Sequence, residues 1–315
     1  KKDEPIAFNG TQWVIEKEYA SLFGNTKVIR LDKTLTGQDG VEQRRHRWIY
    51  FQEGIAQNIM DDNGLSASTF TYALEYLGRV FRPGAESALV LGMGAGFIPQ
   101  RLKENGIAVD VVEINPNAID VARDYFHFDD SGIRLFEEDA RTYIRHCDKR
   151  YDIMVVDLFQ GDGIPDYLLT REFFHDMKQC MSTNGIAVFN TFGTPARLDA
   201  SYYHVLKTIN SEFKTLKMLH DDESDATKMT NIYLLASPSK RLQLDSRVKF
   251  KNIPPSIHQQ LKRVFAKSRP IDKTMLANAM ILTDEHNVFA FHNAQNYLRY
   301  RENLLKIVPE EMLVN

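Results

Sequence analysis

The sequence of 315 residues has few cysteines, no long apolar run and little net charge. Its two cysteines, Cys147 and Cys180, form no Cys/His spacing typical of zinc, so we expect no metal. Few thiols fit a reducing, cytoplasmic compartment. No apolar run approaches the roughly 18 residues that cross a bilayer, and no signal peptide is recognisable. The net charge of -3 gives no reason to expect a nucleic-acid partner.

The first residue is Lys1 and not Met, so a longer natural chain that carries a membrane segment elsewhere stays open. The basic cluster at residues 44–47 has two interpretations, a phosphate contact or a solvated hairpin face. We favour the second, because runs of like charge normally lie in water. The basic cluster therefore adds no argument for a polyanionic partner.

Residues 1–65 are predicted to form a small antiparallel β-domain. Short runs at 13–19, 26–31 and 47–51 are rich in β-branched and aromatic residues, and glycines separate them. From residue 66 the apolar spacing becomes helical and stays so until Pro83. The sequence therefore changes from a β pattern to a different kind of domain near residue 66.

Residues 66–240 alternate between strand and helix patterns, which predicts a parallel sheet covered by helices on both faces. Strands are expected at 87–91, 108–114, 133–136, 152–158 and 186–191, and helices at 97–104, 117–126, 140–146, 170–181 and 198–211.

Two last strand-like runs, 213–219 and 231–236, have no helix between them, so they predict a terminal hairpin with an antiparallel last strand. The remaining residues, 241–315, are expected to form a helical extension packed on the core. The fold class is therefore α/β, with a small antiparallel domain before the parallel sheet.

Three glycines end the first strand of the predicted parallel sheet. Gly92, Gly94 and Gly96 follow an apolar run and precede a helical pattern. Without side chains they let backbone amides and a helix N-terminus approach a ligand closely. The alternative is a tight turn that binds nothing. The spacing differs from the Gly-x-Gly-x-x-Gly of nicotinamide enzymes, and it resembles the first motif of S-adenosylmethionine-binding Rossmann proteins, whose seven-stranded sheet also ends in an antiparallel hairpin.

Each of the next three strand patterns ends in an acid: Glu113, Asp139 and Asp157. In an open parallel sheet, ligands bind beyond the carboxyl ends of the strands. Glu113 can accept hydrogen bonds from both ribose hydroxyls, or it is a solvated strand end. Asp139 and Ala140 are expected at the adenine. Asp139 is also a good N-cap for the following helix, and the two roles are compatible.

The residues after the fourth strand carry a more specific resemblance. Residues 157–165 read Asp-x-Phe-x-Gly-Asp-x-Ile-Pro, and residues 169–173 read Leu-Thr-x-Glu-Phe. This stretch resembles the bacterial branch of the spermidine synthase (polyamine aminopropyltransferase) superfamily, some of whose members are fused to membrane segments. Further matches are Gly54-x-x-Gln57, Phe70-x-Tyr72 and residues 282–287, within a resemblance that covers roughly residues 12–290.

The resemblance implies a transferase of polyamine biosynthesis that uses decarboxylated S-adenosylmethionine or S-adenosylmethionine and releases 5'-methylthioadenosine. Asp157 would be the base that deprotonates or orients the acceptor amine, although it could instead only cap the following loop. Gln57 would join the cofactor site, while Tyr72 and Asp162 would bind the amine. Asp162 is equally compatible with a turn. The family also implies a homodimer, and its membrane-fused members leave inner-membrane tethering open.

Two departures from the family concern the acceptor. The family's His-Glu pair after Phe-x-Tyr is replaced by Ala73 and Leu74, and its Asp-Ser-Ser-Asp-Pro stretch is absent. The nucleoside half is retained and the acceptor half is rewritten. Three alternatives therefore stay open: a lyase that needs no acceptor, a small-molecule methyltransferase, and a non-catalytic nucleoside sensor.

Overall fold

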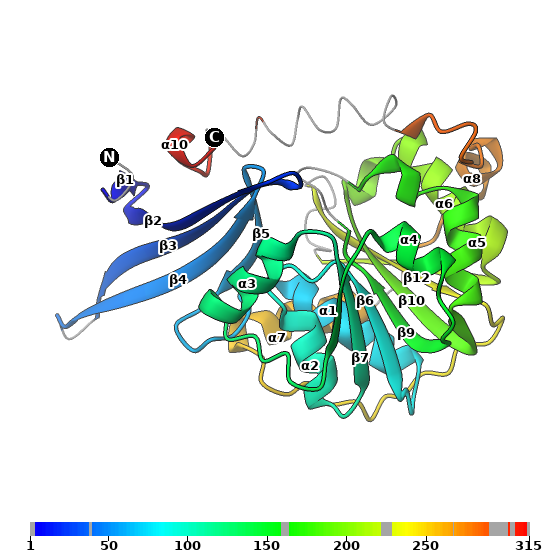
Figure 1. Ribbon diagram of the computed structural model, residues 1–315, viewed down its shortest axis with the longest axis horizontal. Coiled ribbons are helices and arrows are strands. Elements are labelled where there is room, and N and C mark those ends of the chain that lie inside the picture. Colours follow the sequence, from blue (N-terminus) through cyan, green and yellow to red (C-terminus); the bar gives the residue numbers. More distant parts are fainter. Residues whose placement is uncertain are drawn as a thin grey trace.

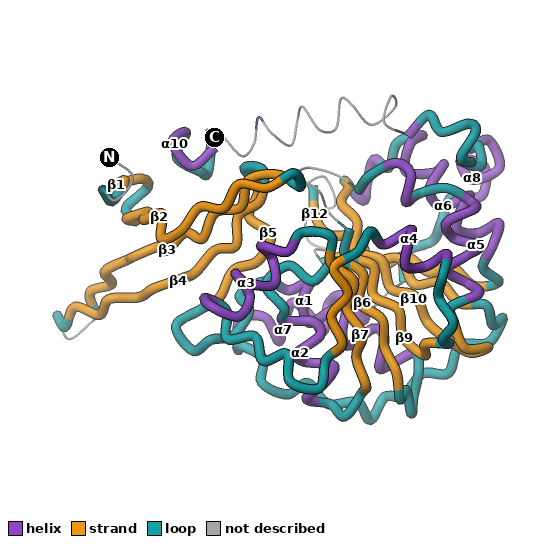
Figure 2. The backbone as a smooth tube through the Cα atoms, in the orientation of Figure 1, coloured by secondary structure: helices purple, strands orange, loops and turns teal. Residues whose placement is uncertain are grey.

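The computed structural model describes residues 4–37, 40–158, 164–221, 229–266, 268–289, 302 and 306–313. An elongated N-terminal sheet extends from one side of a larger α/β body (Figures 1 and 2). The larger body contains a seven-stranded sheet between layers of helices, and the smaller sheet has five strands. The predicted fold class is confirmed.

The N-terminal sheet is antiparallel throughout and keeps the sequence order of its strands. Adjacent residues Val28 and Ile29 are both fully buried, because successive side chains of a strand face opposite sides and both faces are covered. The exposed Arg44 and Arg45 lie on a strand paired with its neighbour, as expected for a hairpin face. The strands are β1 (Ile6–Phe8), β2 (Thr11–Ser21), β3 (Gly24–Thr36), β4 (Glu42–Gln52) and β5 (Ile55–Met60).

The larger sheet has the order β11-β12-β10-β9-β6-β7-β8, and only β12 runs antiparallel to its neighbours. The predicted terminal hairpin is confirmed. The central strands of the seven-stranded sheet are almost wholly apolar, because helices cover both of its faces. The strands are β6 (Ser87–Leu91), β7 (Ala108–Glu113), β8 (Arg134–Glu137), β9 (Tyr151–Val156), β10 (Met181–Gly193), β11 (Thr215–His220) and β12 (Thr230–Ser237).

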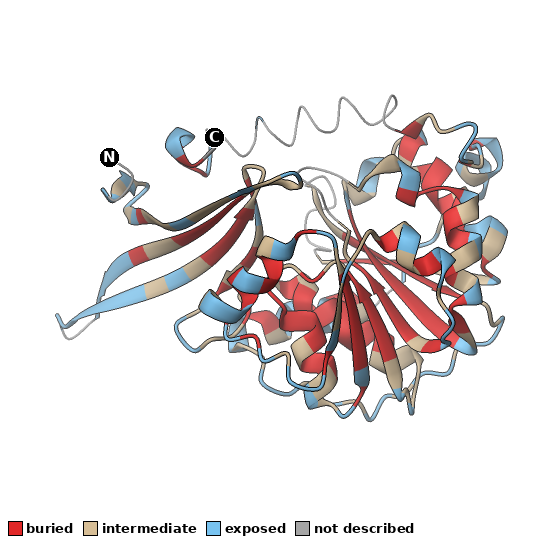
Figure 3. Ribbon diagram, viewed as in Figure 1, coloured by how far each residue is buried: buried red, intermediate tan, exposed pale blue. Residues whose placement is uncertain are grey.

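Alternate residues of β6 divide the core into two layers, visible as the buried centre of the body in Figure 3. Leu89 and Leu91 pack with α4, α5 and α6, whereas Ala88 and Val90 pack with α1, α2 and α3. The helices are α1 (Thr69–Phe81), α2 (Phe97–Glu104), α3 (Pro116–Tyr125), α4 (Ala140–Arg145), α5 (Arg171–Gln179) and α6 (Ala200–Glu212), with single 3₁₀ turns at Asp166–Leu168 and Pro195–Arg197.

The chain after β12 differs from the expected helical extension. Its described helices are short: α7 (Pro255–Ala266), α8 (Lys273–Asn278) and α10 (Glu310–Leu313). Residues 238–254 are not helical, and Pro255 stands at the first position of α7. Helix α7 packs on the larger sheet, but Val308 and Met312 pack on the N-terminal sheet beside Ile29. The extension therefore contacts both sheets. None of the helices in these described ranges is long and apolar enough to cross a membrane.

Candidate active site

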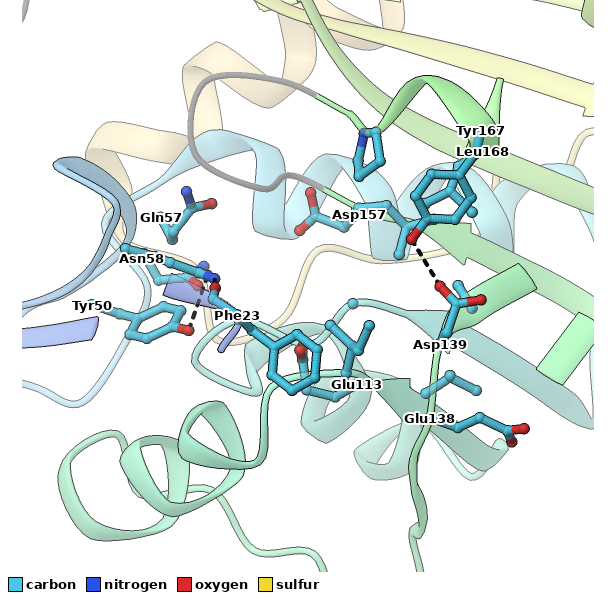
Figure 4. Close-up of a pocket in the computed structure, with 18 residues that line it drawn as sticks. Phe23, Tyr50, Gln57, Asn58, Glu113, Glu138, Asp139, Asp157, Tyr167 and Leu168 are labelled. Carbon is cyan, nitrogen blue, oxygen red and sulfur yellow. Dashed lines mark hydrogen bonds between the residues drawn. The ribbon is translucent and has the colours of Figure 1, made fainter. Parts of the chain in front are cut away.

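A pocket lies at the carboxyl ends of β6, β7 and β9, where the edge of the N-terminal sheet faces them (Figure 4). This is the edge at which parallel sheets bind ligands. The lining residues are Phe23, Tyr50, Gln52, Gln57, Asn58, Gly92, Gly94, Val112, Glu113, Ile114, Glu138, Asp139, Ala140, Asp157, Leu158, Pro165, Tyr167 and Leu168.

Two of the three glycines line this pocket, and both need to be glycine. Gly92 has φ +78°, and a Cβ there would lie 2.2 Å from the carbonyl oxygen of Asp157. Gly94 has φ +50°, and its Cβ would lie 2.3 Å from Oδ1 of Asn58. Gly96 does not line the pocket; it precedes α2 and packs against the ring of Phe128. The turn therefore brings the backbone close to the pocket at Gly92 and Gly94.

Glu113 closes β7 and lies beside the glycine turn. Its Oε2 accepts a hydrogen bond from the backbone N–H of Met93 at 3.0 Å, and its Oε1 accepts one from Asn115 at 2.8 Å. Burial raises the pKa of Glu113 above its usual range, while these amides oppose the rise. The amides fix the carboxylate at the pocket wall, where it can still accept a hydrogen bond from a ligand hydroxyl.

Asp139 combines the two roles considered for it. Its Oδ1 accepts from the backbone N–H of Thr142 at 2.9 Å, so it caps α4. Its Oδ2 accepts from the hydroxyl of Tyr167 at 2.8 Å, inside the pocket (Figure 4). Ala140 lines the pocket next to it. The carboxylate is therefore oriented by the helix and by an aromatic neighbour that the sequence analysis did not identify.

Asp157 follows β9 and lies in the centre of the pocket (Figure 4). Its Oδ1 accepts a hydrogen bond from Nδ2 of Asn190 at 2.9 Å. Burial raises the pKa of Asp157 to about 6, the nearby carboxylate of Glu113 adds to the rise, and the Asn190 hydrogen bond opposes it. A carboxylate tuned in this way can accept a proton near neutral pH.

The N-terminal sheet supplies the opposite wall. Asn58 is buried, and its Oδ1 accepts from the backbone N–H of Ala95 at 2.8 Å, which ties β5 to the glycine turn. Gln57 lines the pocket, and its buried Nε2 has no hydrogen-bond partner among the described residues. A buried amide donor without a partner is costly, so this group is suited to an acceptor atom of a ligand. Gln57 was predicted at this site from the sequence, and Asn58 was not.

Of the two residues predicted to bind the amine, Tyr72 does not line this pocket. Tyr72 is buried in α1, its hydroxyl donates to the carbonyl oxygen of Ser66 at 2.8 Å, and the guanidinium of Arg101 lies 4.6 Å from its ring centre. These contacts belong to the core between α1 and α2. Asp162 lies outside the described residues.

The pocket lining is acidic. Glu113, Glu138, Asp139 and Asp157 carry its charges, and the lining includes no Lys, Arg or His among the residues that the structure describes. Carboxylates gathered around one cavity produce a negative potential that attracts cations. In the same described ranges, no group of three or more His, Cys, Asp or Glu side chains is arranged to hold a metal ion.

Comparison with known sequences identifies one family and related enzymes. Residues 69–219 match the spermine/spermidine synthase domain. A polyamine aminopropyltransferase of Vibrio vulnificus is 36% identical over 150 residues, which are 45% of this chain and 49% of that protein. An N-terminal histidine N-methyltransferase of Emericella nidulans is 29% identical over 228 residues, 68% of this chain and 38% of that protein. The chain thus spans half or less of the length of these two relatives.

Solved structures share the fold. A probable spermidine synthase of Corynebacterium glutamicum has a TM-score of 0.63 at 15% identity and covers 86% of this chain and 96% of its own. The spermidine synthase of Thermotoga maritima has a TM-score of 0.54 at 14% identity, with 91% and 88% covered. Residues 69–219 therefore carry a spermine/spermidine synthase domain, and the chain shares the fold of the solved spermidine synthases.

Proposed function

We propose that this protein transfers the aminopropyl group of decarboxylated S-adenosylmethionine to an amine and releases 5'-methylthioadenosine. The observation that carries the proposal is the acidic pocket at the strand ends, with Asp157 in its centre. The names of the polyamine aminopropyltransferases among its relatives support the same reaction class. In this proposal the glycine turn and Glu113 hold the ribose, and Asp139 with Ala140 holds the adenine.

The charges of the pocket favour the decarboxylated donor. That donor carries a sulfonium and an ammonium group, both positive, whereas S-adenosylmethionine also carries a carboxylate. The described lining contains four carboxylates and no cation to pair with a fifth. Two like charges about 6 Å apart repel by about 3 kcal/mol at an effective dielectric constant of 20. Selection between the donors therefore follows from electrostatics rather than from shape.

Asp157 would act as the general base. A protonated amine has no lone pair, so its proton must leave before attack, and a carboxylate with a pKa of about 6 is ionised and able to take it at neutral pH. The amine nitrogen then bonds to the aminopropyl carbon next to sulfur. The carbon–sulfur bond breaks, its electron pair stays on sulfur, and the neutral thioether of methylthioadenosine leaves. Placement of the two reactants accounts for most of the acceleration.

Incubation with each donor, with and without putrescine, spermidine and a panel of small monoamines, tests the proposal when the nucleoside product is identified by mass spectrometry. We expect methylthioadenosine from the decarboxylated donor and only when an amine is present. S-adenosylhomocysteine would identify a methyltransferase, methylthioadenosine without any amine would identify a lyase, and binding without turnover would identify a sensor. Each of these three outcomes rejects aminopropyl transfer.

A pair of matched variants checks that the product comes from this pocket. Glu113→Gln removes one charge of the lining, and we expect it to weaken binding of methylthioadenosine by tenfold or more, since hydrogen bonds to charged groups are worth about 1.5–3 kcal/mol. Glu104→Gln makes the same change at the exposed end of α2, where it should leave binding and turnover unchanged. Equal effects of the two variants would place the site elsewhere.

A further inference from the structure

Behind Asp157, two asparagines form a row of hydrogen bonds across the sheet. Nδ2 of Asn231, on β12, donates to Oδ1 of Asn190, on β10, at 2.8 Å. Nδ2 of Asn190 in turn donates to Oδ1 of Asp157, after β9, at 2.9 Å. Asn190 is 2% exposed. It pairs with Tyr233 across the two strands, so Asn231, two residues earlier, is its diagonal neighbour on the same face.

The first hydrogen bond of this row decides the direction of the second. An asparagine side chain has one acceptor end and one donor end. Because the oxygen of Asn190 accepts from Asn231, its NH₂ group must face Asp157. A rotated Asn190 would set its oxygen against a carboxylate and its NH₂ against the NH₂ of Asn231. Both contacts would then be repulsive, so a neutral residue two strands away orients the donor at the acid.

We propose that Asn190, held in register by Asn231, is a positioning residue that fixes Asp157 as an ionised base with one oxygen turned to the acceptor amine. The hydrogen bond occupies Oδ1, and no described residue donates to Oδ2. The backbone of Asp157 is also fixed, because its N–H donates to the carbonyl oxygen of Leu91 at 2.9 Å. The inference rests on the proposed function, since it assigns a role within that reaction.

The surroundings of Asp157 make this donor necessary. Burial raises the pKa of Asp157, and the carboxylate of Glu113, on β7, adds to the rise. Burial, the carboxylate of Asp221 and, least, that of Asp157 raise the pKa of Tyr233, on β12, and its hydroxyl donates to Asp221 and not to Asp157. Among the described neighbours, Asn190 is therefore the side chain that stabilises the ionised carboxylate.

The pH dependence of turnover tests the role of the row. Asn190→Leu removes the hydrogen-bond donor and keeps a similar side-chain volume. The acid limb of the kcat/KM profile should then move to higher pH by about one unit, because the free energy of a hydrogen bond to a charged group corresponds to a pKa shift of about that size. Asn231→Leu leaves the Asn190 contact but frees the amide to rotate, so its shift should be smaller and in the same direction. If Asn190→Leu does not fold, the Asn231 variant still decides the case.

Thr191→Val is the matched control. Thr191 is the next residue on β10, and its hydroxyl donates to the carbonyl oxygen of Ile232 at 2.8 Å, so the variant also removes a buried hydrogen bond. Its acid limb should stay where the wild-type limb lies. An unmoved limb in Asn190→Leu, or an equal shift in Thr191→Val, would overturn the proposal.

A readout without catalysis separates this inference from the proposed function. If the wild-type protein turns over no donor, the proposed function fails, and the row is then judged by the pH dependence of unfolding. The stability difference between each protein and its Asp157→Asn counterpart reports the titration of Asp157. We expect the midpoint of that titration to rise by about one pH unit in Asn190→Leu. An unchanged midpoint would reject the row even in an inactive protein.

Discussion

Replacing Asp157 by Asn should abolish turnover and at the same time stabilise the protein. The Asn side chain has the same shape and can still accept from Asn190, so the pocket keeps its geometry. The change removes a carboxylate whose pKa the fold raises from 3.8 to about 6. A group that holds its proton more tightly in the folded state destabilises that state once it is ionised. Function and stability therefore oppose each other at this position.

The size and sign of the effect follow from the two pKa values. Between pH 3.8 and about 6 the folded protein binds a proton that the unfolded chain has released, so stability falls as the pH rises. With 1.36 kcal/mol for each pKa unit, the full difference is about 3 kcal/mol. The variant should therefore exceed wild type by about 1 kcal/mol at about pH 4.5 and by about 3 kcal/mol at about pH 7.5.

Urea unfolding of both proteins across this range measures the difference, and Asp152→Asn is the control on the same strand. Asp152 accepts from Arg82 at 2.7 Å and from the backbone N–H of Glu86 at 3.0 Å, and its pKa is lowered by these donors. Its replacement should destabilise the protein at neutral pH, and the loss should shrink as the pH falls toward the lowered pKa. At neutral pH the two variants should therefore change the free energy of unfolding in opposite directions.

Turnover in Asp157→Asn should fall by a factor of about 10² to 10⁴, the usual contribution of a general base. Binding of methylthioadenosine should persist, because the residues around the ribose and the adenine are untouched. Two results would refute the reasoning. One is a variant no more stable than wild type at neutral pH, and the other is a variant that retains turnover.

Two further changes probe the nucleoside half of the pocket. Gly94→Ala should lower the free energy of unfolding by about 1–2 kcal/mol, because the left-handed backbone at this position disfavours a side chain. The added methyl group would also meet Asn58, so we expect calorimetry to show weaker binding of methylthioadenosine. An unchanged affinity would contradict the proposed site. Tyr167→Phe frees Oδ2 of Asp139 for the adenine amino group of methylthioadenosine. The affinity for methylthioadenosine should then rise by about fivefold, which corresponds to a hydrogen bond worth about 1 kcal/mol. The inosine analogue lacks the amino group, so its affinity should not rise.

The sequence predicted which strand-end residues share one pocket, because these signals are local. Gly92, Glu113, Asp139 and Asp157 each end a strand pattern, and parallel strands bring their carboxyl ends to one edge of the sheet. Gly96 shows the limit of such a motif. It has the required spacing, but the structure uses it to start α2 and to accommodate Phe128.

The rest of the site depends on contacts between segments far apart in the chain. Asn58 reaches the glycine turn from another sheet, and Asn190 and Asn231 meet Asp157 only because β9, β10 and β12 are neighbours. A single asparagine near a strand end carries no pattern that distinguishes it from a turn residue. The division of the chain at residues 65 and 240 stays a prediction, and the C-terminal segment contacts both sheets.

Helix α1 has core residues at the two positions where the family pattern has its His-Glu pair. Ala73 and Leu74 are fully buried and belong to the core beneath the larger sheet. The next residue, Glu75, is also fully buried, and its carboxylate accepts from Arg79 at 2.6 Å and from Arg101 at 3.2 Å. Removing one partner of such a buried pair is strongly destabilising.

Arg101 also connects this cluster to the chain after β12, because its guanidinium donates to the carbonyl oxygens of Lys251 at 3.1 Å and Asn252 at 3.2 Å. Helix α1 therefore anchors α2 and the later chain through Glu75 and Arg101. Helix α1 serves packing here, so under the proposed function any discrimination among amines would come from groups that reach the pocket. The charged groups of the described lining are Asp157 and the carboxylates beside it. Because these groups act through charge, we expect amines to be distinguished by their charge and by how closely their nitrogen can approach Asp157.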